Sequence, residues 1–131
     1  AVTEGSLKCK EISYIHSEAY AAGELKHGTI SLIENGTPVI AVATDEAVLA
    51  KTVSNIREVD ARGAHTVLIT FERFRDAAAG IKDCIFIPET VPQFSVSLSV
   101  IPMQFLSYYI AKNRGCDIDK PKNLAKSVTV E

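Results

Sequence analysis

The residues whose types and spacing could support chemistry are few, and the first two lie near the N-terminus. Lys8 lies three residues before Glu11, so on a helix the two side chains share one face. A carboxylate in such a position can act as a general acid or base. On composition alone, however, a glutamate that follows Lys8 and Lys10 is typical of a charged, solvated helix face.

Two further candidates stand apart from this pair. His27 precedes Gly28, and a lone histidine is more often a structural residue than an acid or base. Lys126 lies five residues before the C-terminus, where composition alone indicates an ordinary tail lysine. The glycines are scattered and form no phosphate-binding fingerprint. No His, Cys and Asp cluster has metal-ligand spacing, so we expect no metal site.

The elements that must position these residues alternate between helical and strand patterns. Residues 2–22 and 24–33 have helical patterns. Thr44 could cap a third helix that continues to about Gly63. Residues 97–113 predict an apolar helix, in which Pro102 introduces a kink or a fresh start. Apolar runs of strand length lie at 39–43, 65–71 and 84–87. Buried runs between helices favour an α/β fold with a parallel sheet and right-handed crossovers.

Composition limits the function classes. A chain of 131 residues is long enough for one domain, and its formal charge of −2 gives no basic excess for nucleic acid or an anionic membrane. We take the longest apolar stretches to have only the length of a strand, so we expect no membrane-spanning segment. The three cysteines, Cys9, Cys84 and Cys116, indicate free thiols in a reducing compartment, and hence a cytoplasmic protein.

Three stretches carry a resemblance to a known family. Residues 11–16 read EISYIH, residues 18–28 read EAYAAGELKHG, and the chain ends with DIDKPKNLAKSVTVE over 117–131. These motifs are long, and the chain resembles the isomerase part of the glutamine–fructose-6-phosphate aminotransferases. The resemblance implies a flavodoxin-like SIS (sugar isomerase) fold, with residues 1–115 as a second SIS domain that lacks its opening strand. Residues 116–131 would then be a C-terminal tail that closes the active site.

The resemblance also implies a role for each candidate residue. Glu11 would move a proton from C1 to C2 of the sugar, and Lys8 would assist proton handling near the substrate hydroxyls. His27 would open the sugar ring in the site of a neighbouring subunit. Lys126 would form a Schiff base with the ketone, which requires the neutral amine that burial favours. Ala125 would contact the sugar through its backbone, and Glu11 would also bind substrate.

The implied activity is synthesis of glucosamine 6-phosphate from fructose 6-phosphate and glutamine-derived ammonia, without a cofactor. The implied partners are a glutaminase domain and a first SIS domain of the same parent chain, and a second copy in a homodimer. Because the phosphate anchor belongs to the first SIS domain, we expect the fragment alone to be inactive. The alternative is a non-catalytic SIS module that binds a phosphosugar and regulates a partner.

Overall fold

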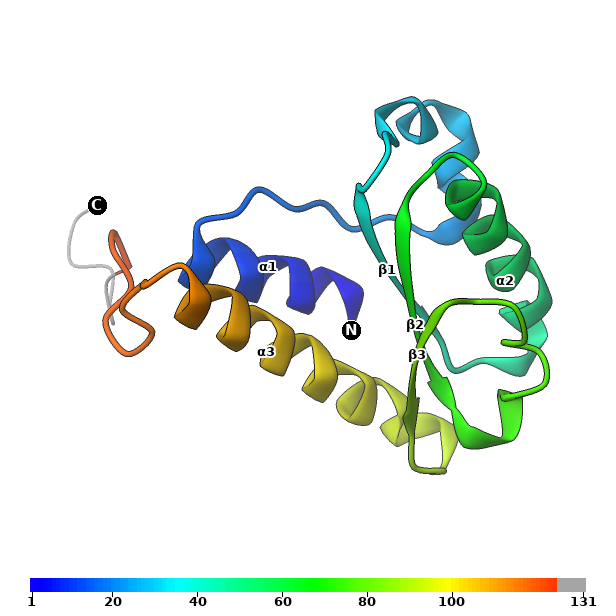
Figure 1. Cartoon of the computed structure of the whole chain (residues 1–131). Coiled ribbons are helices and arrows are strands. Elements are labelled where there is room, and N and C mark those ends of the chain that lie inside the picture. Colours follow the sequence, from blue (N-terminus) through cyan, green and yellow to red (C-terminus); the bar gives the residue numbers. More distant parts are fainter. Residues whose placement is uncertain (125–131) are drawn as a thin grey trace.

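The architecture is a parallel sheet with helices on both faces, seen in a computed structural model that describes residues 1–124 (Figure 1). The α-helices are α1 (Val2–Ser13), α2 (Glu46–Asp60) and α3 (Ser95–Asn113), and the strands are β1 (Pro38–Ala43), β2 (His65–Phe71) and β3 (Asp83–Ile87). Short 3-10 helices are η1 (Ala22–His27), η2 (Thr29–Leu32), η3 (Glu72–Phe74) and η4 (Pro92–Phe94).

The sheet has the order β1-β2-β3 with all strands parallel, as the buried apolar runs predicted. In its register Leu68 lies between Ala41 and Cys84, and its side chain is fully buried. The helix α2 connects β1 to β2 and covers one face, whereas α1 and α3 lie together on the other side of the sheet (Figure 1). The predicted α/β class is therefore confirmed.

The core lies where the sheet meets these helices. Leu68, Ile69 and Phe71 of β2 are almost completely buried, and α2 adds Val53 and Ile56. Burial of such side chains contributes roughly 1.5–3 kcal/mol each, so the contact between β2 and α2 contributes a large share of the stability. The buried Thr70 hydroxyl donates to the carbonyl oxygen of Ala43 at 2.6 Å, so the polar atom is satisfied beside the ends of β1 and β2.

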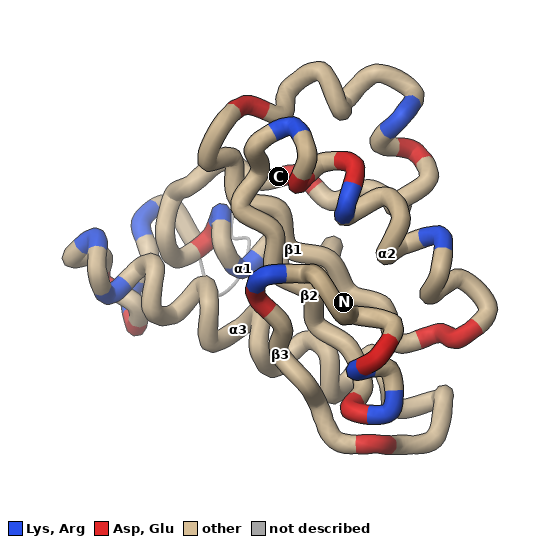
Figure 2. The backbone as a smooth tube through the Cα atoms, turned by 45° about the vertical axis from the view of Figure 1, so that its right-hand side comes forward, with Lys and Arg blue, Asp and Glu red and all other residues tan. Residues whose placement is uncertain are grey.

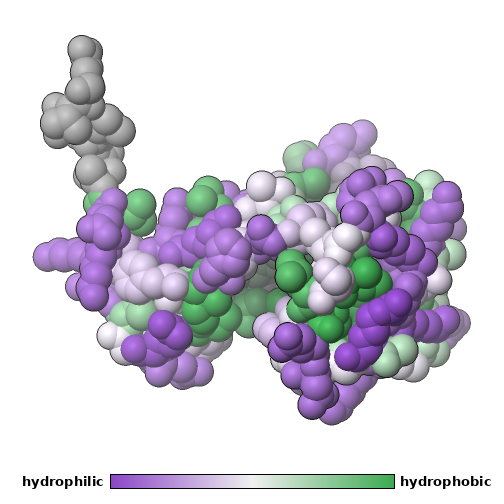
Figure 3. All heavy atoms as spheres, turned by 90° about the horizontal axis from the view of Figure 1, so that it is seen from above, coloured by the Kyte–Doolittle hydropathy of each residue, from purple (hydrophilic) through white to green (hydrophobic). Residues whose placement is uncertain are grey.

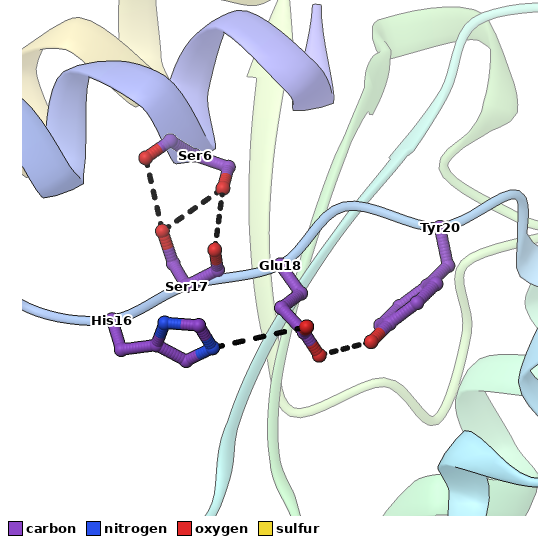
Figure 4. A network of polar contacts seen from close by, with 5 residues as sticks. All are labelled: Ser6, His16, Ser17, Glu18 and Tyr20. Carbon is purple, nitrogen blue, oxygen red and sulfur yellow. Dashed lines mark hydrogen bonds and ion pairs between the residues drawn. The ribbon is translucent and has the colours of Figure 1, made fainter.

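The first helix is shorter than its sequence pattern predicted. Expected over 2–22, it ends at Ser13, because Tyr14 takes a left-handed conformation with φ 58° and the chain then runs extended to Ala21. Serine hydroxyls explain the difference, since they bond to backbone groups and compete with further helix. Ser6 Oγ donates to the carbonyl oxygen of Ser17 at 2.9 Å, and Ser17 Oγ donates to that of Ser6 at 2.9 Å (Figure 4).

Two other helix predictions are corrected. The single helix expected over 24–33 is replaced by η1 and η2, because Gly28 between them has φ 139°, a conformation outside any right-handed helix. The cap of α2 is Asp45 instead of Thr44, since the Asp45 carboxylate accepts from the backbone N–H of Ala47 at 2.9 Å.

The last helix, α3, runs without interruption through Pro102, so the fresh start that the proline suggested does not occur. Its buried stripe repeats every fourth residue and consists of Ser99, Met103, Ser107 and Ala111. The small members of this stripe allow close packing on α1. Gly5 of α1 lies so near that an added Cβ would be 2.3 Å from the Met103 Cε atom.

The remainder of α3 is apolar and exposed. No charged residue occurs from Ser95 to Ala111, and this part of the tube in Figure 2 is tan. By length and composition alone, residues Pro92–Asn113 could cross a membrane. Of the 18-residue apolar stretch within this helix, 22% is buried in the protein. The expectation that every apolar stretch is strand-sized is therefore wrong here. One such helix is weak evidence for a membrane, because core helices of other proteins pass the same test.

Candidate functional site

Lys8 and Glu11 form the centre of the candidate site on the last turns of α1. The Lys8 ammonium donates to Glu11 Oε2 at 2.7 Å, and Glu4 Oε1 lies 3.5 Å from the same nitrogen. The Glu11 side chain is 25% exposed and that of Lys8 is 35% exposed, so the pair remains open to a ligand. The structure therefore brings these two residues together, as their spacing predicted.

The charge state of Lys8 follows from this contact. The hydrogen bond to Glu11 raises the pKa of Lys8 above its usual 10.5, and this effect outweighs partial burial, which acts in the opposite direction. Lys8 is therefore a permanent cation at neutral pH and donates to the carboxylate. Among the described residues, the other Glu11 oxygen, Oε1, accepts no hydrogen bond, which leaves it available to take a proton from a bound molecule.

The position of α1 is set by small buried side chains. Gly5 allows α1 to approach Met103 of α3, and the Ser6–Ser17 bonds tie the extended segment after α1 back onto the helix. Ser13 is completely buried, and its hydroxyl donates to the carbonyl oxygen of Cys9 at 2.6 Å. These contacts fix the turn that carries Lys8 and Glu11.

A further group of polar side chains follows on the extended segment (Figure 4). Glu18 accepts a hydrogen bond from the Tyr20 hydroxyl, and its other oxygen lies 3.8 Å from Nε2 of His16. His16 is 83% exposed, so its pairing with Glu18 is a surface contact. This group lies on the segment between α1 and η1 and is exposed.

His27 lies apart from the Lys8–Glu11 pair. It is the last residue of η1 and is exposed. The helix η1 packs on α2, where Lys26 Nζ lies 2.6 Å from Glu58 Oε2, and α2 covers the opposite side of the sheet from α1 (Figure 1). Within one chain, the structure therefore does not bring His27 to Glu11.

The last two candidates, Ala125 and Lys126, lie outside the described residues. The chain just before them is described and lies against α1. Asp117 Oδ1 accepts from the backbone N–H groups of Asp119 at 3.1 Å and Lys120 at 2.9 Å, which makes a tight turn. The Lys122 N–H then donates to the Tyr14 hydroxyl at 2.7 Å.

Tyr14 is the residue that sequence reasoning left without a role. It lies three residues after Glu11, and its hydroxyl contacts a residue 108 positions further along the chain. No local pattern could reveal this contact, because no spacing rule relates residues so far apart. Only its place inside the motif at 11–16 distinguished it.

Comparison with known proteins supports the fold and the family. Residues 3–114 match the family described as SIS domain. Two curated relatives, both called glutamine–fructose-6-phosphate aminotransferase (isomerizing), come from Clostridium tetani, 61% identical, and Bacillus subtilis, 55% identical. Each match covers 98% of this chain and 21% of the relative, so the chain spans about a fifth of their length.

Two solved structures resemble the fold. The C-terminal domain of glucosamine-fructose-6-phosphate aminotransferase from Francisella tularensis has a TM-score of 0.78 and 40% identity, over 89% of this chain and 33% of that one. Glucosamine-6-phosphate deaminase from Thermotoga maritima has a TM-score of 0.73 and 29% identity, over 95% and 35%. Since the family match covers most of the described residues, the chain belongs to the SIS domain family.

Proposed function

We propose that the chain is the C-terminal part of the isomerase portion of a glutamine–fructose-6-phosphate aminotransferase. Such an enzyme would make glucosamine 6-phosphate from fructose 6-phosphate and ammonia derived from glutamine. The proposal is supported by relatives of that name that are 61% and 55% identical across 98% of the chain. The likeness to a glucosamine-6-phosphate deaminase supports the same class of compound, since glucosamine 6-phosphate is the product that the proposed enzyme would form.

The observation that carries the proposal is the ion pair between Lys8 and Glu11 on α1. In the proposed reaction, a carbonyl carbon at C2 becomes an imine, and a proton must then move from C1 to C2. Glu11 would take that proton on its free oxygen and return it to the neighbouring carbon, as a single carboxylate can. Lys8 would hold the carboxylate in place through its hydrogen bond while the proton is transferred.

The other steps would use residues outside the Lys8–Glu11 pair. His27 would pass a proton between the ring oxygen and the anomeric hydroxyl in the neighbouring subunit of a homodimer, in line with its distance from α1 in the fold. The neutral Lys126 amine would attack the ketone and release water to form the Schiff base. Ammonia would then displace the lysine, and Ala125 would contact the sugar through its backbone.

The remaining partners would be parts of the same parent chain and a second copy. A glutaminase domain would supply ammonia, and a first SIS domain would hold the sugar phosphate. The exposed apolar side chains of α3, Phe105 and Tyr109 among them, give a surface that such partners could cover. Figure 3 shows that hydrophobic residues, in green, reach the surface among hydrophilic ones on the face seen from above. The parent enzyme would be cytoplasmic.

The test replaces the matching segment of the Clostridium tetani relative, which aligns over 128 residues, with this chain and measures synthesis of glucosamine 6-phosphate. We expect an active chimera, because the exchanged segments are 61% identical. Lys126→Ala should abolish both synthesis and borohydride trapping of fructose 6-phosphate. Glu11→Gln should abolish synthesis while the sugar is still trapped.

The matched control is Lys120→Ala, which removes another tail lysine and should leave synthesis unchanged. A folded chimera that makes no product, or a Lys126→Ala variant that keeps making it, would contradict the proposal. A folded chimera that binds fructose 6-phosphate without trapping it would instead favour the non-catalytic SIS module.

A further inference from the structure

The short helix η1 is attached to α2 through a charged contact. None of its six residues is buried, so no fully buried apolar side chain fixes its position. Lys26, near the end of η1, has its Nζ atom 2.6 Å from Oε2 of Glu58 on α2. The other oxygen of this carboxylate, Oε1, lies 3.2 Å from the Arg62 guanidinium. Both oxygens of Glu58 are therefore paired with cations, and one of these pairs connects η1 to the end of α2.

The position of Glu58 on its own helix shows that it depends on these cations. It lies in the last turn of α2, where the negative end of the helix dipole disfavours a carboxylate. The hydrogen bond from Lys26 nevertheless lowers the pKa of Glu58 below its usual 4.5, so the side chain is ionised at neutral pH. The Lys26 side chain is 51% exposed and that of Glu58 is 31% exposed. A bridge of this kind changes a local equilibrium about two- to fivefold.

The bridge lies directly beside His27 in the chain. His27 follows Lys26 as the last residue of η1, and its side chain is exposed. Gly28, which comes next, has φ 139°, and its carbonyl oxygen accepts the Ser31 N–H at 3.0 Å and the Ser31 hydroxyl at 2.7 Å. Among residues 1–124, the His27 ring has no hydrogen-bond partner of its own. The bridge before it and the hydrogen-bonded turn after it therefore set where His27 lies.

We propose that Glu58 is a positioning residue that attaches η1 to α2 through Lys26, and so presents His27 outward to a sugar ring in the site of a neighbouring subunit. The attachment of η1 rests on the contacts of the described residues alone. Its consequence for ring opening rests on the proposed function, in which His27 transfers a proton to the ring oxygen. The two parts are therefore tested by separate measurements.

The attachment is tested by NMR hydrogen exchange on the 131-residue chain. The Glu24 N–H donates to the carbonyl oxygen of Ala21 at 2.9 Å, at the start of η1. Because so short a helix is unstable by itself, exchange of this amide reports whether η1 is packed on α2. Glu58→Gln should accelerate the exchange about two- to fivefold. Lys26→Arg keeps the cation and should behave as the wild type, as should Glu46→Gln, the same change at an exposed carboxylate at the start of α2.

The consequence is tested in the chimera with the Clostridium tetani relative, by borohydride trapping of two sugars. In fructose 6-phosphate the anomeric hydroxyl must lose a proton while its carbon's bond to the ring oxygen breaks and that oxygen gains a proton. The analogue 5-deoxyfructose 6-phosphate lacks the hydroxyl that closes the ring, so it is always open.

Glu58→Gln should lower the trapping rate of fructose 6-phosphate about two- to fivefold and leave that of the open analogue unchanged. His27→Gln should produce the same selective loss, about a hundredfold or more, because it removes the proton-transfer group itself. Lys26→Gln should reproduce the effect of Glu58→Gln, and the double variant should lose no more than either single variant, since both break one bridge. Lys26→Arg should retain the wild-type rate.

An unchanged exchange rate of the Glu24 amide in Glu58→Gln would overturn the attachment. Faster exchange with unchanged trapping of fructose 6-phosphate, or an equal loss for both sugars, would overturn the positioning role. If the wild-type chimera traps neither sugar, or His27→Gln traps fructose 6-phosphate at the wild-type rate, the proposed function fails in that step. The exchange of the Glu24 amide then still decides whether Glu58 attaches η1 to α2.

Discussion

The replacement Gly5→Ala tests how closely α1 must pack on α3 to place the candidate site. Gly5 is buried, and an added Cβ would lie 2.3 Å from Met103 Cε and 2.9 Å from both Met103 Cβ and Sδ. The Cε atom is the far end of a flexible side chain and can move. The Cβ atom is fixed to the α3 backbone, so the helices themselves must separate, and Lys8 and Glu11 would move with α1.

The expected cost follows from two opposing effects. Overpacking a buried contact costs about 1–3 kcal/mol, whereas alanine gains about 1 kcal/mol over glycine inside a helix. Because a backbone-linked atom takes part in the clash, we expect the steric effect to dominate. The free energy of unfolding should fall by about 1–2 kcal/mol, or roughly 4 °C in Tm for each kcal/mol.

The assay is urea denaturation followed by circular dichroism, which gives the midpoint and the m-value. Gly23→Ala is the control, because nothing lies within 4 Å of a Cβ added there. In a Met103→Ala background the contacts to Cε and Sδ are gone, so Gly5→Ala should cost about 1 kcal/mol less. A Gly5→Ala chain that is as stable as the wild type, or more so, would refute the argument from close packing.

Three further changes test the helix cap, the ion pair and the exposed face. Asp45→Ala removes the acceptor for the Ala47 N–H and should lower the unfolding free energy by about 1 kcal/mol in the same denaturation assay; no loss would contradict the capping role. Since Glu11 raises the pKa of Lys8, the charge of Lys8 contributes fully from neutral pH to pH 10.5, and this contribution is lost as pH rises through the raised pKa. The stability difference between wild type and Lys8→Met should therefore persist from neutral pH to pH 10.5 and shrink above it; a difference that disappears between neutral pH and pH 10.5 would count against the pair. Phe105 is 58% exposed on an uncharged helix face, so Phe105→Ser should reduce self-association in light scattering, and an unchanged mass would rule out that face as the contact.

Much of the fold could be predicted from local pattern. The three buried strands, the amphipathic α2 and the apolar α3 follow from the spacing of their hydrophobic residues, because burial on a sheet or helix imposes its own period. The parallel arrangement followed from the alternation of these elements. The end of α1 at Ser13 did not, because it depends on hydroxyl contacts to Ser17 that the apolar spacing does not register.

The sequence alone determined the identity of the candidate residues and, through the i and i+3 spacing of one helix, the pairing of Lys8 with Glu11. Tertiary structure decided the rest. It separated His27 from that pair by placing η1 against α2, and it joined Tyr14 to Lys122 across 108 positions. The physical reason is range: helical spacing relates side chains a turn apart, whereas contacts between distant segments arise only when the packed core brings their elements together.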